Sequence, residues 1–147
     1  MIELADLKAA CNAVLRRCYP AYSIYGSDST EGLDRPGFYT EIIPYYFKYS
    51  SKNYADCSAG YKITFLEETP DEVAQLTLVA ELRKAFGMTV RVAGRPLLVG
   101  QISHDYAGQN NDILQITISF EWVDIMTREE PEEIMQDVDI QYTQKGD

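Results

Sequence analysis

Alternating apolar and polar residues between Asp112 and Val123 form the clearest pattern in the chain. Apolar side chains occupy every second position from Leu114 to Trp122, and polar side chains fill the positions between them. Successive side chains of a strand point to opposite faces, so this period of two predicts a half-buried β-strand. The apolar face ends in the only tryptophan, and we expect the chain's two helices to cover it.

Two segments have the three-and-four spacing of amphipathic helices. The first is predicted over residues 3–17, with an apolar stripe that begins at Leu4, and Pro20 stops it. The second begins at Thr69-Pro70-Asp71-Glu72, where Thr69 is expected to cap the helix and Glu72 to complete a capping box. Gly87 is expected to follow its last turn. Its predicted buried stripe consists of Val73, Leu76, Val79, Ala80 and Phe86.

Two longer apolar segments predict a β-hairpin in the first half of the chain. A short strand over Tyr22–Tyr25 is followed by a polar loop over Gly26–Arg35, whose composition disfavours regular structure. Gly37–Tyr49 and Cys57–Glu67 then read as an extended antiparallel hairpin, rich in aromatic residues, whose tip projects beyond the core. Pro44 cannot donate to a strand ladder and therefore marks an edge or a bulge.

The second half repeats the order of a helix followed by three strands. Met88–Val92 and Pro96–Ile102 predict another hairpin, and His104–Asn111 a polar turn. The whole order predicts an α+β, two-layer fold: a mixed or antiparallel sheet with two helices packed on one face plus a β-hairpin. We expect residues 1–127 to form a single domain and residues 128–147 an acidic C-terminal arm or tail.

The charge distribution limits the classes of partner. The formal net charge is −10, and eight acidic and two basic residues lie between Asp124 and the end. Tight binding to a nucleic-acid backbone needs clustered Lys and Arg, so we expect no specific nucleic-acid binding, although DNA could pass such a surface. No signal peptide is visible and no run approaches 18 apolar residues, so no membrane association is expected. Three cysteines without a CxxC motif predict free thiols.

Residues with catalytic or metal-binding chemistry are sparse. His104 is the only histidine, and without a nearby cysteine it predicts a turn residue and not a metal ligand. The acidic pairs Glu67-Glu68 and Asp71-Glu72 flank a helix start, where anions favour the helix dipole. The four glutamates within 129–133 have no EF-hand spacing and resemble a solvated charged face. We therefore expect no enzyme activity, no catalytic residue, no cofactor and no metal.

Several local sequences resemble a known family. Tyr19-Pro20 closes the first helix, Glu31-Gly32 lies in the polar loop, and Pro36-Gly37-Phe38-Tyr39 opens the long strand. With Ile24-Tyr25, the later capped helix and the strand ending at Trp122, this order resembles the phage tail terminators, a family of small phage and prophage proteins of Gram-positive bacteria. The resemblance covers residues 7–125.

The resemblance implies a structural protein of the virion tail, assembled in the cytoplasm of the bacterial host. Members would form a homo-oligomeric, hexameric ring on the last ring of the tail tube, stop its polymerisation and offer a surface to the head–tail connector. The expected partners are the tail tube protein and the connector protein. Contacts are expected in the 27–37 loop, the 44–58 hairpin tip and the 128–147 arm, with the candidate interface residues Asp28, Glu31, Arg35, Tyr45, Tyr46, Tyr49, Tyr54, Arg128 and Tyr142.

Two alternatives remain open at this point. The chain could be another structural protein of the same assembly, such as a head–tail connector or a tail tube subunit. It could also be a small-molecule-binding or enzymatic domain that uses the region around Tyr45-Tyr46 and His104. A deep, well-formed pocket would favour the second alternative.

Overall fold

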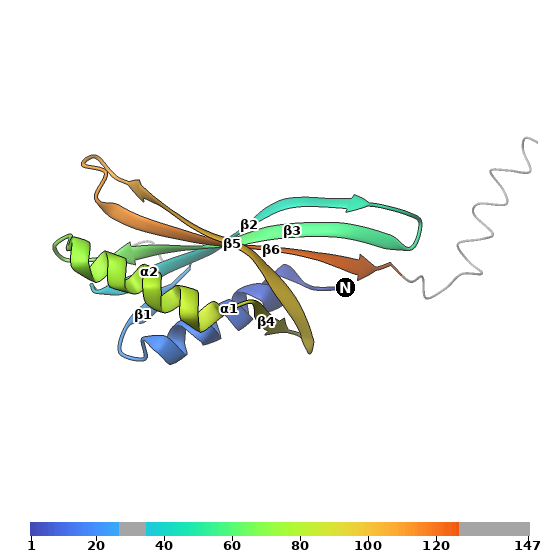
Figure 1. Cartoon of the computed structure of the whole chain (residues 1–147), viewed down its shortest axis with the longest axis horizontal. Coiled ribbons are helices and arrows are strands. Elements are labelled where there is room, and N and C mark those ends of the chain that lie inside the picture. Colours follow the sequence, from blue (N-terminus) through green and yellow to red (C-terminus); the bar gives the residue numbers. More distant parts are fainter. Residues whose placement is uncertain (27–34, 127–147) are drawn as a thin grey trace, which may run out of the picture.

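The computed structural model describes residues 1–26 and 35–126 (Figure 1). Two helices and six strands follow in the predicted order of one helix and three strands, repeated once. The elements are α1 (Leu4–Cys18), β1 (Ser23–Tyr25), β2 (Gly37–Tyr49), β3 (Tyr54–Leu66), α2 (Glu72–Phe86), β4 (Thr89–Val92), β5 (Arg95–Ala107) and β6 (Ile113–Ile125). The predicted α+β class is confirmed.

One mixed sheet joins all six strands in the order β1-β2-β3-β6-β5-β4. β1 and β2 are parallel, and the other neighbours are antiparallel. In the central pair, Tyr61 lies opposite Ile118 and Ile63 opposite Ile116, and all four side chains are buried. Residues directly opposite each other share a face, so the alternation in β6 does place its apolar side chains on one buried face.

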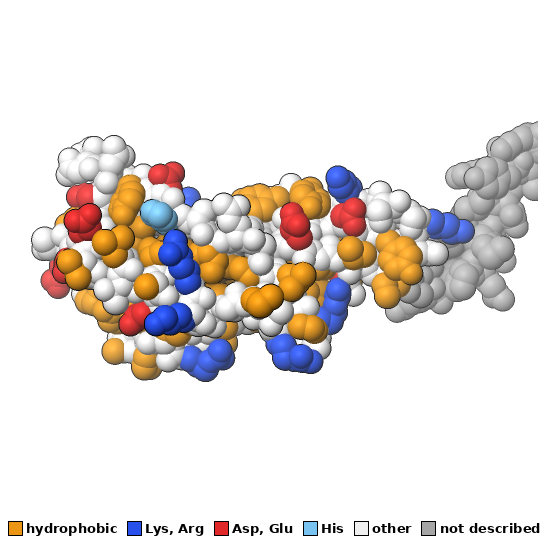
Figure 2. Space-filling model, viewed as in Figure 1, with side chains coloured by type: hydrophobic (Ala, Val, Ile, Leu, Met, Phe, Trp, Pro, Cys, Tyr) orange, Lys and Arg blue, Asp and Glu red, His pale blue; other side chains and the backbone are white. Residues whose placement is uncertain are grey.

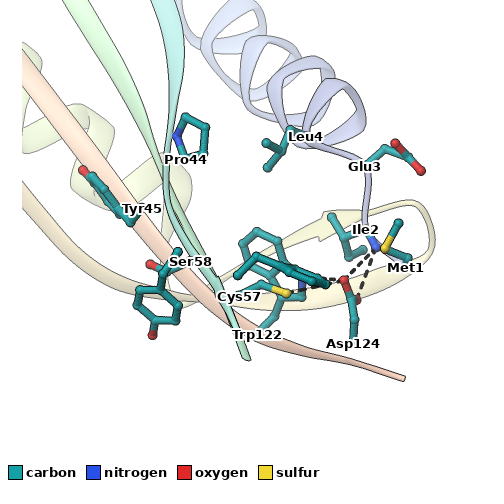
Figure 3. Close-up of a pocket in the computed structure, with 12 residues that line it drawn as sticks. Met1, Ile2, Glu3, Leu4, Pro44, Tyr45, Cys57, Ser58, Trp122 and Asp124 are labelled. Atoms are coloured by element: carbon teal, nitrogen blue, oxygen red, sulfur yellow. Dashed lines mark hydrogen bonds between the residues drawn. The ribbon is translucent and has the colours of Figure 1, made fainter. Parts of the chain in front are cut away.

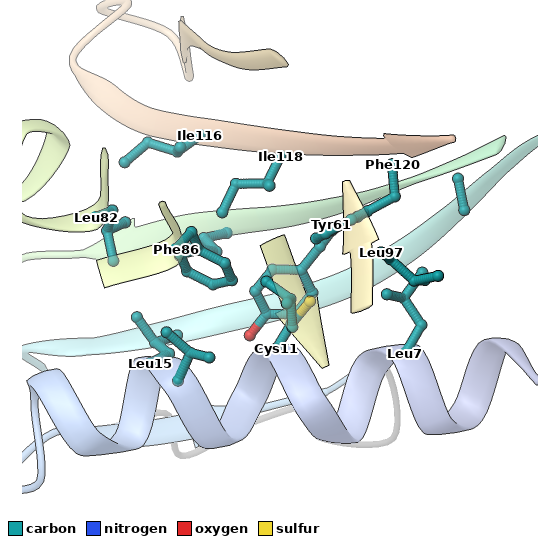
Figure 4. Packing of buried hydrophobic residues seen from close by; sticks show 14 of the residues in the cluster. Leu7, Cys11, Leu15, Tyr61, Leu82, Phe86, Leu97, Ile116, Ile118 and Phe120 are labelled. Atoms are coloured by element: carbon teal, nitrogen blue, oxygen red, sulfur yellow. The ribbon is translucent and has the colours of Figure 1, made fainter. Parts of the chain in front are cut away.

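Both helices cover that face (Figure 1). α1 contributes Leu7, Cys11 and Leu15, each with no exposed surface. Leu82 and Phe86 come from α2 and pack in the same cluster against the sheet (Figure 4). Burial of these apolar side chains supplies the main favourable term for folding.

The predicted start and buried face of α2 are wrong. Asp71, not Thr69, caps the helix, because its Oδ1 accepts hydrogen bonds from the amides of Val73 and Ala74 at 3.1 and 3.5 Å. Val73 and Leu76 are 72% and 55% exposed, and Ala80 is exposed too. Val79 and Phe86 are buried as predicted. The face toward the sheet follows a line of residues three and four apart: Gln75, Leu78, Val79, Leu82 and Phe86.

Gln75 explains why the pattern misleads. Its side chain is polar, yet it is 4% exposed and occupies the first position of the buried line. Its amide donates to Glu67 Oε1 at 2.7 Å and to the carbonyl of Asp112 at 3.1 Å. With both hydrogen bonds made, burial of the amide is tolerated. A prediction that considers only apolar residues leaves out Gln75 and therefore places Val73 and Leu76 on the buried face of the helix.

The polar turn predicted over His104–Asn111 is also wrong in its first half. β5 continues to Ala107 and pairs with β6, with His104 opposite Ile116. The turn is confined to the residues after Ala107, where Gly108 and Asn111 have positive φ angles of 91° and 53°. The backbone ladder does not depend on side-chain polarity, so polar residues extend an exposed strand.

Two further predictions concern residues outside the described ranges. Most of the predicted loop over Gly26–Arg35 and the arm over 128–147 lie there. The predicted domain boundary after residue 127 also lies beyond Met126, the last described residue. It stays a prediction.

The buried line of α2 gives a direct test. Leu78→Ala should lower the free energy of unfolding by about 2–5 kcal/mol, because it leaves a cavity at a site that is 2% exposed. Leu76→Ala, two residues earlier, should change it by less than about 0.5 kcal/mol, because the side chain is 55% exposed. Urea unfolding monitored by circular dichroism measures both. Equal effects would contradict the observed face of the helix.

Candidate functional site

The outer half of the β2–β3 hairpin extends beyond the helices (Figure 1). Every residue of β2 from Pro44 to the last residue of the strand, Tyr49, is exposed. Five aromatic side chains gather here, and we call them the aromatic tip. They and their exposed fractions are Tyr45 48%, Tyr46 42%, Phe47 49%, Tyr49 60% and Tyr54 48%. Hydrophobic side chains lie at the surface near this end of the molecule in Figure 2.

A β-bulge distributes these rings over both faces of the hairpin. The register shifts between Pro44 and Tyr46, so Tyr45 is an extra residue in β2. Tyr46 then lies opposite Ser58, whereas Phe47 lies opposite Cys57 on the other face. Large apolar area is therefore presented in two directions, an arrangement suited to protein contacts.

Glycine permits part of this packing. Tyr45 lies against Gly60 of β3, and a Cβ added to Gly60 would overlap the Tyr45 hydroxyl. On the second face, the rings of Phe47 and Tyr49 meet edge to face with centroids 5.6 Å apart. These contacts hold three rings of the aromatic tip in place before any partner binds, which lowers the entropy cost of binding.

An apolar groove lies beside the aromatic tip, and we call it the N-terminal groove. The segment Met1–Leu4 lines one side, and Pro44 of β2 lies across from it (Figure 3). Phe47 of β2 lines the groove as well. Cys57 and Trp122 belong to its floor. Its volume is about 420 Å³. A groove of this size accepts one or two apolar side chains of a partner.

Asp124 at the end of β6 holds this groove together. Its carboxylate is 1% exposed and accepts hydrogen bonds from the Ile2 amide at 3.2 Å and from Trp122 Nε1 at 3.2 Å. Arg95 Nη1 of β5 forms an ion pair with it at 2.8 Å. The dashed lines in Figure 3 show how it ties the N-terminal segment to β3 and β6. One carboxylate thus connects the chain start with three strands.

The charge of Asp124 is stabilised where it lies. Burial by itself raises the pKa of this carboxyl, but the hydrogen bonds from Arg95, Trp122 and the Ile2 amide outweigh burial. The nearby N-terminal amino group acts in the same direction, and the pKa lies below its usual value of 3.8. Asp124 is therefore an ionised structural anchor and does not transfer protons near neutral pH.

Cysteine chemistry is suppressed at this site. Burial, together with the charge of Asp124, raises the pKa of the Cys57 thiol to about 11. The thiol donates to Asp124 Oδ2 over 3.6 Å. Burial likewise raises the pKa of Cys11 to about 12. A protonated thiol is a poor nucleophile and a poor metal ligand. All three cysteines are free, as predicted, but Cys18 is exposed.

His104, the other residue of the enzymatic alternative, lies elsewhere. Its exposed side chain is on β5, where its ring meets Tyr106 edge to face with centroids 6.0 Å apart. It does not line the N-terminal groove, so Tyr45 and His104 share no pocket there. Within residues 1–26 and 35–126, no group of three or more His, Cys, Asp and Glu side chains is placed to hold a metal ion.

The structure brings four of the nine candidate interface residues together. Tyr45, Tyr46, Tyr49 and Tyr54 all belong to the aromatic tip. Arg35 lies at the opposite end of β2, where its Nη1 donates to the Glu67 carbonyl at 3.0 Å. The remaining four lie outside the described residues: Asp28, Glu31, Arg128 and Tyr142.

Sequence reasoning missed the N-terminal groove and its anchor. The signal for Asp124 was present, because the period of two in β6 continues from Trp122 to Asp124 on the buried face. A carboxylate at an inward position requires partners, which are cations or hydrogen-bond donors. The pattern could not identify these partners, since Arg95 lies 29 residues away and Ile2 lies 122 residues away. The wall at Met1–Leu4 gave no signal.

Comparisons with known proteins bear on this arrangement. A family described as phage tail terminator protein matches residues 6–134. No curated protein matches the chain. Eleven chains of solved structures match, and one of them has 15% sequence identity and a TM-score of 0.50. The match covers 88% of this chain and 100% of that chain, and at this identity it supports the fold alone. No helix in the described part of the chain is long and apolar enough to cross a membrane.

Asp124→Asn tests the anchor. The variant should lower the free energy of unfolding by about 2 kcal/mol at pH 7, because it removes hydrogen bonds to a charged group. The folded-state pKa is below the unfolded value, so this stabilisation is complete above about pH 4 and is lost as the pH falls through the folded-state pKa. Urea unfolding at pH 7 and at pH 3 measures the change.

The pH dependence separates the anchor from ordinary acid sensitivity. The difference between wild type and Asp124→Asn should shrink at the lower pH, because the wild-type carboxyl approaches protonation there. Asp6→Asn, at an exposed position in the first turn of α1, serves as the control and should differ from wild type by less than about 0.5 kcal/mol. A difference for Asp124→Asn that grows on acidification would contradict the anchor.

Proposed function

The chain belongs to the phage tail terminator family, and from this we propose that it ends tail-tube growth by closing the tube's last ring. The family is structural and not enzymatic. In the proposed mechanism, one surface of the protein binds the tail tube protein, and the opposite surface does not repeat the tube's own docking surface. Further tube subunits then find no site, and the head–tail connector binds instead.

The aromatic tip is the observation that carries this proposal. Soluble proteins rarely leave a cluster of large apolar side chains in water unless a partner covers it. Phe47 and Tyr49 are exposed on the β2–β3 hairpin, and Phe47 lines a groove of about 420 Å³. We propose that the tip and the N-terminal groove together bind the end of the tail tube.

Two open strand edges support assembly into a ring. β1 pairs with β2 only as far as Tyr39, so Thr40–Tyr49 has no strand partner on its outer edge among the described residues. β4 pairs with β5 only as far as Leu98. The outer edge of Gly100–Ala107 therefore also has no strand partner among the described residues. The two edges lie on opposite sides of the sheet. Different surfaces on opposite sides permit the heterologous contact that closes a ring, and we propose a hexamer.

Charge is compatible with DNA passing through such a ring. The chain has 23 acidic and 13 basic side chains. A lumen with excess negative charge would repel the DNA backbone and let it move without adhering. This proposal needs no specific nucleic-acid binding and no cofactor.

The first test is tail length in particles made without this protein. Electron microscopy should show abnormally long or irregular tails, because tube growth would lack its stop. Tails of normal length, separated from filled heads, would favour a head–tail connector instead. Normal, fully joined and infectious particles would contradict both roles.

Phe47→Ser with Tyr49→Ser tests the aromatic tip itself. Both side chains are about half exposed or more, so the melting temperature should stay within a few degrees of wild type. Tails assembled with this variant should be abnormally long, because the surface proposed to bind the tube has lost its apolar area. Electron microscopy of the assembled tails measures the effect.

A matched control removes apolar area at the other end of the molecule. Val73→Ser with Leu76→Ser changes two side chains of α2 that are 72% and 55% exposed. Tails made with this control should have normal length. Equal effects of the two double variants would sink the assignment of the aromatic tip as the tube-binding surface.

A further inference from the structure

Charge is divided unevenly between the folded body and the C-terminal arm, residues 128–147. The arm holds seven acidic and two basic residues, a net charge of −5, which is half of the total of −10. Basic side chains, by contrast, gather over the helical layer and the β4 turn (Figure 2). Arg95 is the one Lys or Arg that has an ion pair within residues 1–26 and 35–126. The other Lys and Arg side chains of this part form no ion pair with another described residue.

Two of these cations border a second groove, which we call the basic groove. Arg17 of α1 and Arg91 of β4 line it, and both are exposed. Small and apolar side chains, including Ala13, Ala85 and Val90, line the rest. Its volume is about 230 Å³, and no acidic side chain is among its described lining residues. Arg91 Nη2 donates a hydrogen bond to the Gly94 carbonyl at 2.9 Å, and this bond leaves the Nη1 and Nε groups of the guanidinium for other acceptors.

The chemistry of the basic groove defines what it binds. Guanidinium groups pair with carboxylates through two parallel hydrogen bonds, and the alanine-lined floor accepts an apolar side chain. A fitting ligand is therefore an acidic peptide with adjacent apolar residues. The arm contains this pattern in Glu132-Glu133-Ile134-Met135.

We propose that the basic groove binds the C-terminal arm of a second copy of this chain. This inference deepens the proposed ring function and rests on it for the presence of neighbouring copies. The glutamates of the arm pair with Arg17 and Arg91, and Ile134 or Met135 enters the groove between them. Because groove and arm are different surfaces, the contact is heterologous, as a ring requires.

The described part of the chain ends at the exposed end of the sheet. The Met126 amide donates to the Asn53 carbonyl at 2.7 Å, so the chain leaves the body at the turn of the β2–β3 hairpin. That turn is at the end of the sheet away from α2 (Figure 1), and Arg95, which follows β4, forms its ion pair with Asp124 close to this exit. The ring proposed above supplies a neighbour's basic groove for the arm, and the mixture of variants described below separates that groove from the chain's own groove.

Self-association of the full chain measures the contact. The groove variant is Arg17→Glu with Arg91→Glu, and the arm variant changes Glu129, Glu130, Glu132 and Glu133 to Gln. Each should weaken self-association at least about tenfold in sedimentation velocity, because charge pairs that fix the contact are removed. Wild-type association should also weaken at high salt. A wild-type chain that stays monomeric at every concentration would overturn the inference.

Arg16→Glu with Arg83→Glu is the matched control. These two exposed arginines lie in the last turns of α1 and α2, carry the same charge change and do not line the basic groove. The control should associate as wild type does. A loss as large as that of the groove variant would show a general charge effect and overturn the specific contact.

Mixing the two variants decides between a neighbour's arm and the chain's own arm. The arm variant retains an intact groove, and the groove variant retains an intact arm. Their mixture should form a one-to-one dimer and stop there, because the second groove–arm pair is defective on both sides. A mixture that stays monomeric would overturn binding between copies.

The result can be separated from the tube-capping proposal. If Phe47→Ser with Tyr49→Ser lengthens tails while the groove and arm variants associate normally, the arm contact is wrong and the capping function stands. If the arm contact is verified while the aromatic-tip variant leaves tails normal, the capping surface is wrong and the arm contact stands.

Discussion

The buried carboxylate of Asp124 is the interaction on which the exposed end of this protein depends. A sheet that extends beyond its helices loses the apolar cover that normally fixes its side chains. Here the segment before α1 replaces that cover, and Asp124 fixes it through the Ile2 amide. The same group binds Arg95 of β5 and Trp122 of its own strand. Without its charge these donors would have to find water in a space with little access to it.

This anchor also explains why a large apolar surface can remain ordered in water. The rings of the aromatic tip are supported by the sheet, by Gly60 under Tyr45 and by the wall at Met1–Leu4. A surface held in one shape binds with a smaller loss of conformational entropy than one that must be ordered by its partner. Asp124 thus acts on binding indirectly, by positioning the groove beside the tip.

Much of the fold could be predicted because periodicity is a local property of the sequence. The alternation in β6, the bounds of β2 and the order of the elements all follow from it. The bulge at Pro44 was predictable too, since proline cannot join a central ladder. Four tyrosines of the candidate interface were brought together because two neighbouring strands carry them.

The wrong face of α2 and the missed anchor of the groove both involve a polar residue that is buried by partners distant in sequence. Gln75 is held by Glu67 and by the carbonyl of Asp112, 37 residues away, and this displaced the predicted face of α2. Asp124 meets Ile2 across 122 residues. A local pattern can place such a polar residue on a buried face, but it does not show which distant residue forms the hydrogen bond. Hydrogen bonds of this kind also shape the N-terminal groove, which explains why the fold was easier to predict than the candidate site.

The open strand edges illustrate a last constraint on an assembling protein. An unpaired edge invites pairing with any other edge, which leads to aggregation. In this sheet each open edge carries a register shift, between Pro44 and Tyr46 in β2 and between Val99 and Gln101 in β5. Bulges and proline interrupt the regular ladder that indiscriminate pairing needs. A partner must therefore match a particular edge shape, so the features that protect the free subunit also restrict which contacts can form.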